Sequence, residues 1–413
     1  MIKNAIAGGS TPGAQVMLIK NGKVFYQKSF GHHQYQKKQR VKNDDLYDLA
    51  SVTKIASTTL ASMKLYEQKR FGINDKLSKH LDIGEDSPMK RTTIKQLFKH
   101  QSGLQANMPV ADYILYKDTL NQDCNKYFCK EPQEDYVVEI ADSIFMDKKW
   151  IDSLWQEVYQ LKPRRRKRFK YSDVNFNLVQ KMLEAKTKQA LNEYVEEQFY
   201  EPLNLKHCMY RPLEEFDSLQ IVPTAYDKRW RNQILRGHVH DESAALMGGV
   251  GGNAGLFSNA GDLGILFQMI LNGGSYGGKT YLQPETIKYF TTARHGNHRG
   301  LGFDMNAKRR APSCSSKASK GTYGHTGFTG TCVWVDPKEE LIFIFLANRI
   351  NPDVKNRRIF KKRLRYRVHN LVYEALDTYQ PLKLDLANKK KKSKINHAQF
   401  TSFELEGDLT CLD

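Results

Sequence analysis

Long apolar runs are missing from this 413-residue sequence. No stretch approaches the roughly 18 consecutive apolar residues that a transmembrane helix needs, so no membrane anchor is expected. Residues 1–9 lack the apolar core of a signal peptide, which predicts a cytoplasmic chain as the sequence stands. The hydrophobic content of 40% and the aromatic content of 11% are nevertheless typical of a folded globular protein. The length allows a large core and two packed lobes.

Cysteine motifs are also missing. The six cysteines form no CxxC pair and no zinc-type spacing, and they are Cys124, Cys129, Cys208, Cys314, Cys332 and Cys411. We therefore expect free thiols, although Cys124 and Cys129 are close enough for a local disulfide in an oxidising compartment. The run His238-Val239-His240-Asp241 is interpreted as polar surface rather than a metal site. No metal or organic cofactor is expected.

Acidic residues are fewer than basic ones, 45 against 64, which gives a formal net charge of +19. Basic runs lie at 162–170 and 389–394. Aromatic residues are not interleaved with them as a base-stacking surface would require, so both are interpreted as solvated surface. No nucleic-acid partner is expected, and a steep salt dependence of binding would be its signature. The polar tail at 379–413 is predicted to be disordered.

Strand patterns occur near both ends of the sequence. Residues 13–31 form two strand-like runs around Asn21-Gly22, which is a strong hairpin signal because both turn residues accept positive φ. Near the other end, strand-like runs lead to residues 341–348, an almost continuous apolar segment expected of a central strand. Helix patterns dominate between them.

This order of elements predicts an α+β fold. We expect an antiparallel sheet built from both termini and flanked by helices, with a helical lobe inserted. The sheet lobe is predicted to comprise 1–95 and 290–378, and the mostly helical inserted lobe 96–289. Residues 105–170 are interpreted as helices and loops of that lobe.

Ser51 and Lys54 stand where a helix is expected to begin. Residues three apart lie on one helix face, so an amine would be within reach of a hydroxyl. A serine hydroxyl becomes nucleophilic when a base takes its proton, and a desolvated lysine can be that base. Alone, the spacing also fits a capping serine followed by a solvated lysine.

Two further short elements follow in the sequence. Tyr171-Ser172-Asp173 opens a helix, with Asp173 as a candidate N-cap, and His325-Thr326-Gly327 stands at the head of a strand. The glycine-dense residues 247–258 are interpreted as a tight loop lining a cleft. A phosphate-binding loop is disfavoured, because no buried strand precedes these glycines.

Together, Ser51-x-x-Lys54, Tyr171-x-Asp173 and His325-Thr326-Gly327 resemble the three elements of the penicillin-recognising serine hydrolase superfamily. The tyrosine variant resembles class C β-lactamases, DD-peptidases and related esterases. A closer likeness is to the β-lactamase-like module that Bacteroidetes proteins carry behind a family 3 β-N-acetylglucosaminidase domain, which suggests a separated glycosidase domain as a partner. Members of the superfamily are mostly periplasmic or exported. The segment 97–104 also looks like the family's short helix and turn.

The resemblance implies a reaction and a substrate class. Ser51 would attack a carbonyl and form an acyl-enzyme, while Lys54 and Tyr171 would share and return its proton. The backbone N–H groups of Ser51 and Phe328 would form the oxyanion hole. Thr326 and His325 would orient and polarise the site, and Gly327 would let the substrate lie beside the strand. The expected substrate is an ester, an amide or a peptidoglycan fragment.

Two departures from the family pattern favour an alternative. His325 replaces a lysine and, being only partly charged near neutral pH, would hold a carboxylate less firmly. Asp173 replaces an asparagine, and its charge should favour a protonated Lys54 and oppose a tyrosinate. The alternative is a catalytically weak penicillin-binding or wall-fragment-binding module.

Overall fold

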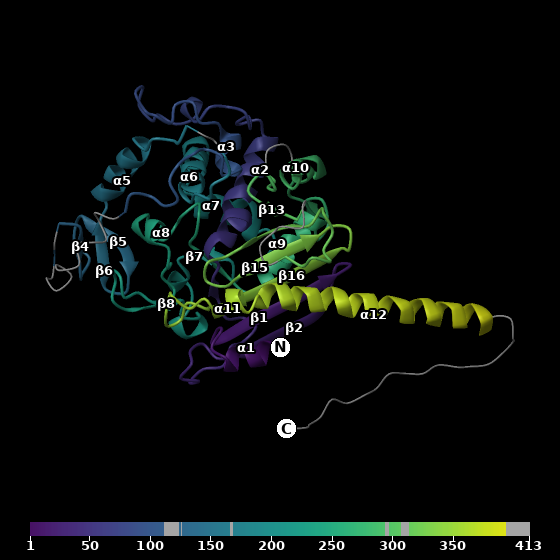
Figure 1. Ribbon diagram of the computed structural model, residues 1–413. Helices are drawn as coiled ribbons and strands as arrows, with labels where there is room; N and C mark the ends of the chain where they lie inside the picture. Colours follow the sequence, from purple (N-terminus) through teal and green to yellow (C-terminus); the bar gives the residue numbers. More distant parts are fainter. Residues whose placement is uncertain (111–123, 125, 166–167, 294–296, 307–313, 394–413) are drawn as a thin grey trace. The chain divides into compact units, whose positions relative to one another are not determined.

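A computed structural model describes residues 1–110, 124, 126–165, 168–293, 297–306 and 314–393 (Figure 1). Two compact units divide the chain, Met1–His369 and Asn370 onward. The first unit contains an antiparallel six-stranded sheet in the order β13-β14-β15-β16-β1-β2. Its strands are β1 (Gly13–Lys20), β2 (Lys23–Gly31), β13 (Asp304–Met305), β14 (Tyr323–Thr326), β15 (Cys332–Asp336) and β16 (Leu341–Ala347).

The sheet joins the two ends of the first unit, as predicted. β16 pairs with β1 on one side and with β15 on the other, and all seven of its residues are buried. Its continuous apolar sequence is what a strand covered on both faces requires. The β1–β2 turn places Asn21 and Gly22 at φ 52° and 72°, which confirms the predicted hairpin. The α+β fold class is therefore confirmed.

Helices cover the sheet and fill the inserted region. Helix α9 lies on β1 and β16, and Gly264 permits this close approach, because a Cβ there would stand 2.8 Å from Met17 Sδ. The helices of the first unit are α1 (Ile2–Ala7), α2 (Thr59–Glu67), α3 (Ile94–Phe98), α5 (Lys149–Tyr159), α6 (Val174–Thr187), α7 (Leu191–Val195), α8 (Glu242–Leu246), α9 (Ala260–Leu271), α10 (Pro284–Phe290) and α11 (Arg358–Lys361).

Short elements complete this unit. The 3₁₀ and π turns are η1 (Ala50–Val52), η2 (Lys54–Thr58), η3 (Leu77–Lys79), η5 (Glu196–Tyr200), η6 (Pro212–Glu214) and η7 (Ser218–Gln220). The small sheets pair β3 (Tyr47–Asp48) and β7 (Met209–Tyr210) with β10 (Leu256–Ser258), β8 (Ala225–Tyr226) with β9 (Ile234–Leu235), and β11 (Ser275–Tyr276) with β12 (Lys279–Thr280).

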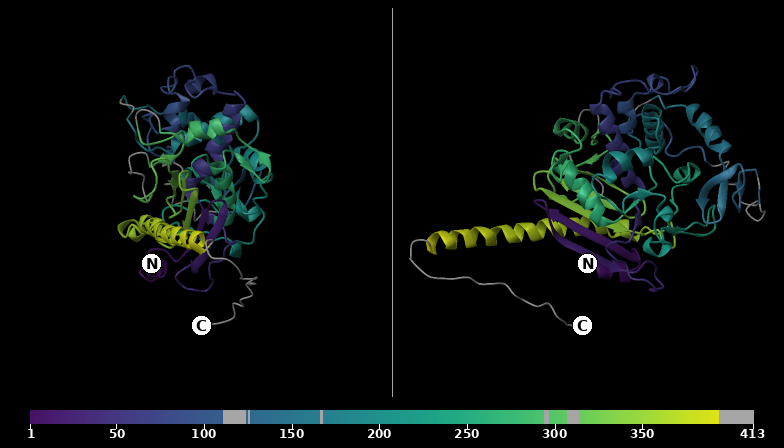
Figure 2. Two further views of the ribbon diagram at one scale, coloured as in Figure 1. Left: turned by 90° about the vertical axis from the view of Figure 1, so that its right-hand side faces the viewer. Right: turned by 180° about the vertical axis from the view of Figure 1, so that it is seen from behind.

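The inserted region contains a three-stranded sheet. The sequence predicts only helices and loops for residues 105–170, so this sheet is a correction. Its strands are β4 (Phe128–Cys129), β5 (Tyr136–Ala141) and β6 (Ile144–Asp147), and Figures 1 and 2 place it at the end of the first unit away from the six-stranded sheet. The β5–β6 turn has no glycine. Ser143 takes the left-handed conformation there instead, at φ 55°, so the usual hairpin signal was absent.

Two sequence predictions need correction. Cys124 and Cys129 form a disulfide, because the two residues pair across a tight antiparallel turn, whereas six free thiols were expected. Cys208, Cys314 and Cys332 are buried thiols, and Cys411 lies outside the described residues.

Helix α12 (Leu364–Ser393) continues through residues 379–393, which were predicted to be disordered. The leucine, alanine and lysine residues of this stretch are strong helix formers, and their helix propensity outweighs the polar composition. The remainder of the predicted tail, 394–413, lies outside the described residues. Within the described part of the chain, no helix is long and apolar enough to span a membrane.

Candidate active site

Ser51 lies in the turn that precedes helix α2. The predicted helix begins as the 3₁₀ turn η1, continues as the π turn η2 and becomes α-helical at Thr59. This path keeps Ser51 and Lys54 one turn apart and buries the Lys54 side chain completely. Lys54 Nζ donates to Ser51 Oγ across 2.9 Å.

Tyr171 and Asp173 reach the same point from the start of helix α6. Tyr171 OH donates to Ser51 Oγ at 2.8 Å. Asp173 occupies the N-cap position, as predicted, but its side chain makes no capping hydrogen bond. Its Oδ1 accepts from Lys54 Nζ at 2.5 Å instead. Two elements about 120 residues apart thus converge on one hydroxyl.

Lys54 has an acceptor for each of its three N–H bonds. Besides Ser51 Oγ and Asp173 Oδ1, it donates to Asn253 O at 2.9 Å. Burial alone would lower the pKa of Lys54, but the charges of Asp173 and Tyr171 outweigh burial and leave the pKa raised. The amine is therefore an ammonium at neutral pH.

The pKa values of Tyr171 and Asp173 are both raised, for related reasons. Burial raises the pKa of Tyr171 and the Asp173 charge adds to this, although Lys54 opposes both, so Tyr171 is a neutral phenol. Burial also raises the pKa of Asp173, with Asp241 adding to the shift and Lys54 opposing it. These directions agree with the expectation that Asp173 favours a protonated Lys54 and opposes a tyrosinate.

His325 differs from the expectation of partial charge. It is 2% exposed, and burial lowers its pKa to about 3, so the imidazole is neutral at physiological pH. Nδ1 faces Thr326 O at 2.9 Å, which assigns the ring proton to Nδ1. Nε2 is buried and has no hydrogen-bond partner among the described residues.

Gly327 is required by packing inside the protein. A Cβ at this position would stand 2.0 Å from Thr331 Oγ1 and 2.5 Å from Leu49 O. The Gly327 N–H donates to Thr331 O at 2.8 Å, so this group is already used within the β14–β15 connection. Contact with Thr331 and with the Ser51 segment thus requires a glycine here, and its role beside a substrate strand stays a prediction.

Beyond Gly324, no strand of the described residues pairs with the outer edge of β14 next to the site. β13 pairs only with Tyr323 and Gly324, so Thr326 extends past its neighbour, and it is partly exposed. Phe328 is 49% exposed and stacks on His240 with 5.8 Å between ring centroids. In the described part of the chain, the N–H groups of Ser51 and Phe328 have no acceptor. Both are therefore available as oxyanion donors.

Asp48 fixes the backbone around Ser51, and sequence reasoning missed it. Its carboxylate accepts the N–H of Ala50 at 2.8 Å and that of His240 at 3.0 Å. Thr329 and Thr331 donate their hydroxyls to the carbonyl groups of Asp48 and Leu49, which ties the β14–β15 connection to the nucleophile's segment. Only the three-dimensional pairing reveals these roles, because none of these residues belongs to a local catalytic pattern.

The cleft beside Ser51 has a volume of about 810 Å³. Tyr171, Asp173, Phe328 and Ala254 line it, together with His240. Within the glycine-dense residues 247–258, Ala254 lines this cleft and Asn253 contributes the carbonyl that binds Lys54, so the prediction of a cleft-lining loop is confirmed. Among the described residues no cluster of candidate metal ligands is present.

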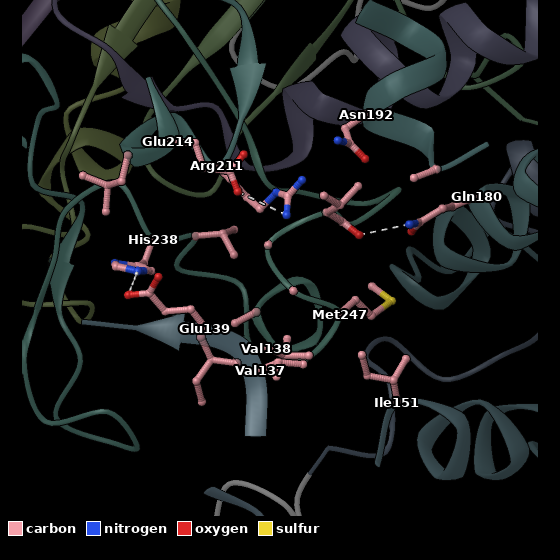
Figure 3. A pocket seen from close by; sticks show the side chains of 18 of the residues that line it. Val137, Val138, Glu139, Ile151, Gln180, Asn192, Arg211, Glu214, His238 and Met247 are labelled. Carbon is pink, nitrogen blue, oxygen red and sulfur yellow. Dashed lines mark hydrogen bonds and ion pairs between the residues drawn. The ribbon is translucent and has the colours of Figure 1, made fainter. Parts of the chain in front are cut away.

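A second cavity of about 610 Å³ lies between the inserted sheet and helices α5 and α6 (Figure 3). Four of its polar side chains pair within the protein: His238 lies 3.3 Å from Glu139, and Arg211 lies 3.2 Å from Glu214. None of Ser51, Lys54, Tyr171 and Asp173 lines this cavity. The chemistry described above therefore belongs to the other cleft.

The sequence matches the Beta-lactamase family over residues 1–365. The chain belongs to the Beta-lactamase family. It is similar to the "Putative D-alanyl-D-alanine carboxypeptidase" of Escherichia coli (strain K12), with 31% identity over 365 residues, covering 82% of this chain and 78% of the relative. It is also similar to the N-acetylmuramyl-L-alanine amidase of Bacillus subtilis (strain 168), with 30% identity over 376 residues, covering 84% and 79%.

Solved structures share the fold of this Beta-lactamase family chain. One is EstCE1, a hydrolase with promiscuous acyltransferase activity, at a TM-score of 0.64 and 18% identity, covering 88% of this chain and 94% of that one. The family match and these relatives make the chain a serine hydrolase of the penicillin-recognising superfamily, as the three sequence elements predicted.

Proposed function

We propose that the protein is a serine acyl hydrolase that cleaves an amide bond in cell-wall peptides through an acyl-enzyme on Ser51. The observation that carries this proposal is the pair of hydrogen bonds on Ser51 Oγ, from Tyr171 OH at 2.8 Å and from Lys54 Nζ at 2.9 Å. Both groups lie within proton-transfer distance of the Ser51 hydroxyl. The names of the carboxypeptidase and amidase relatives support the substrate class.

Attack by Ser51 requires a proton acceptor, and Asp173 supplies it through Lys54. The 2.5 Å contact lets Lys54 pass one proton to the Asp173 carboxylate as it takes the proton of Ser51 Oγ. The new O–C bond forms while the carbonyl oxygen becomes an oxyanion held by the N–H groups of Ser51 and Phe328. The ammonium charge of Lys54 is the same before and after this step.

Collapse of the tetrahedral intermediate needs a proton on the leaving nitrogen. Tyr171 donates its phenolic proton to the leaving nitrogen as the C–N bond breaks, and it is reprotonated from Asp173 through Lys54, which hydrogen-bonds to Tyr171. Water then attacks the acyl-enzyme by the same route in reverse, with Tyr171 and Lys54 again carrying protons. His325, being neutral, contributes a dipole to the site and no charge.

A weak penicillin-binding or wall-fragment-binding module is the second candidate. It is favoured by the neutral imidazole of His325, because a substrate carboxylate or a penicillin would meet no cation at this position. In this case acylation at Ser51 would occur and deacylation would be slow.

Intact-mass spectrometry separates the candidates. The wild-type protein and Ser51→Ala would each be incubated with a fluorophosphonate, a fluorescent penicillin, a p-nitrophenyl ester and a peptide ending in D-Ala-D-Ala. The hydrolase predicts one fluorophosphonate adduct on the wild type alone, with turnover of the ester or the peptide. A penicillin adduct that persists without turnover supports the binding module. No adduct on folded wild-type protein contradicts both.

A further inference from the structure

Residues 100–107, which follow helix α3, hold the start of helix α6 through hydrogen bonds. This segment is outside the three catalytic elements, yet it makes a series of hydrogen bonds to residues 170–173. They are Lys170 N–H to His100 O at 2.9 Å, Ser172 N–H to His100 Nδ1 at 3.2 Å, Ser172 Oγ to Gln105 O at 2.5 Å and Asp173 N–H to Ala106 O at 2.6 Å. The position of Tyr171 therefore depends on a neighbouring segment as well as on helix α6.

His100 makes the central contacts of this segment. Its ring stacks on Tyr171, with 4.3 Å between centroids and 28° between planes. Nδ1 accepts hydrogen bonds from Ser172 N–H and from Asn175 Nδ2, each at 3.2 Å. The ring proton is therefore on Nε2, and the imidazole is completely buried. One side chain thus fixes both the face of the Tyr171 ring and the backbone that follows it.

The surroundings of His100 keep it neutral. Burial lowers its pKa well below the usual value, and the charges of Arg299 and Lys54 and the nearby His325 act in the same direction. Protonation of Nδ1 would also break both hydrogen bonds that it accepts. His100 therefore acts by its shape and its acceptor and does not carry a proton in the reaction.

We propose that His100 is a positioning residue that holds Tyr171 OH against Ser51. This inference rests on the proposed function, because it assumes that Tyr171 moves the proton of Ser51. A misplacement of about 1 Å at a reacting group lowers the rate by roughly a hundredfold. Loss of the His100 contacts should therefore slow acylation by about this factor in a protein that remains folded.

Two variants separate the two contacts. His100→Phe keeps a ring against Tyr171 and removes the acceptor for Ser172 and Asn175. His100→Asn keeps an acceptor near Nδ1 and removes the ring, and asparagine tolerates the left-handed backbone of this position, where φ is 50°. If the acceptor positions Tyr171, His100→Phe should slow fluorophosphonate labelling about a hundredfold. If the stacked ring positions Tyr171, His100→Asn should do so instead.

His369 provides a matched control. It is also buried, it stacks on Phe343 at 4.4 Å, and its Nδ1 accepts the N–H of Ser315 at 3.1 Å. It contacts no candidate catalytic group in these interactions. His369→Asn should therefore destabilise the protein to a similar extent, as followed by thermal unfolding, and leave the labelling rate of the folded fraction unchanged.

The pH profile of ester hydrolysis gives a second readout. Without the stacked ring, Tyr171 gains hydration, and the alkaline limb of kcat/KM should move to lower pH in His100→Asn but not in His369→Asn. The inference is overturned if both His100 variants label within about twofold of His369→Asn and keep the wild-type profile. If the wild type itself fails to label at Ser51, the proposed function fails instead, so the two failures are distinguishable.

Discussion

Lys54–Asp173 and Arg231–Asp227 are both ion pairs with a completely buried cation, at 2.5 Å and 2.8 Å. The pKa of Asp227 is lowered: burial raises it, but the charge and hydrogen bond of Arg231 and the backbone N–H groups of Trp230 and Arg231 outweigh burial. The pKa of Asp173 is raised, because burial dominates and, among the described residues, Lys54 alone donates to its carboxylate.

This difference separates a fixed charge from a mobile proton. Arg231 uses its remaining N–H groups on the carbonyl oxygens of Val239 and His240, so its pair with Asp227 anchors the wall of the cleft. Lys54 uses its remaining N–H groups on Ser51 and on Asn253 O. A carboxyl group whose pKa is raised towards neutrality can take a proton during the reaction, whereas Asp227 can only remain charged.

Removal of Lys54, the cation of the pair with Asp173, should have the largest effect on acylation. In Lys54→Met the route from Ser51 to Asp173 is lost, so acylation should fall by about 10²–10⁴-fold. The rate of fluorophosphonate labelling measures this, with circular dichroism to verify folding. Lys64→Met is the control from the same helix, because Lys64 Nζ donates to Tyr281 O, away from Ser51. Unchanged labelling in Lys54→Met would remove Lys54 from the mechanism.

Removal of Arg231, the cation of the pair with Asp227, should lower the stability of the protein. Arg231→Met leaves Asp227 buried without its partner, which should lower the free energy of unfolding by about 3–5 kcal/mol. Urea denaturation measures this, and the folded fraction should still label at Ser51. Arg229→Met breaks the exposed pair with Glu242 and should cost at most about 1 kcal/mol. Equal losses in the two variants would contradict the assignment of Asp227 as a structural charge.

Asp48 shows what a buried carboxylate does without a cation. It accepts two backbone N–H groups, yet burial raises its pKa from 3.8 to about 6. Because the folded state then binds this proton more tightly than the unfolded state, the contribution of Asp48 to stability is full below about pH 4 and is lost as pH rises through about 6. The loss should be about 3 kcal/mol, and Asp48→Asn should abolish it.

Urea denaturation at pH 4, 5, 6 and 7 measures how the free energy of unfolding of each protein changes with pH. The slope of the wild type is then compared with that of Asp48→Asn. Asp44→Asn, at an exposed position in the same segment, is the control. A slope that survives in Asp48→Asn would assign the titration to another group.

Sequence reasoning reached the elements whose signals are local. Asn21-Gly22 predicted the hairpin, and the three short motifs predicted which residues would meet, because each motif carries its residue types at fixed spacing. Asp48, His100 and Arg231 were not predicted, because their roles depend on partners far away in the sequence: Asp48 reaches His240, and His100 reaches Tyr171. No periodicity or motif encodes such contacts.

The charge of His325 was misjudged for a similar reason. Its residue type suggests partial protonation near neutral pH, but complete burial removes the charge. Asp173 was judged correctly on charge, because opposite charges within one site act on each other whatever the surrounding packing. Its capping role was not realised, since the side chain pairs with Lys54. The sequence alone could not rank these two uses of one carboxylate.

Asp173→Asn tests the mobile proton directly. In the wild type the reaction needs an ionised Asp173, so activity should fall as pH drops through its raised pKa. The asparagine cannot accept the proton, and the reaction then needs a neutral Lys54. The acid limb of kcat/KM should therefore move to higher pH and report Lys54, whose pKa falls once the charge of Asp173 is removed but still exceeds that of a carboxyl group.

Each pH unit by which this limb lies above neutrality should lower activity at pH 7 by about tenfold, with recovery at higher pH. Asp262→Asn is the control, because Asp262 is also a largely buried carboxylate with a raised pKa but lies in helix α9 and accepts from the His207 N–H. An acid limb that stays in place in Asp173→Asn would mean that Lys54 acts without Asp173 and that the two buried pairs differ in stability alone.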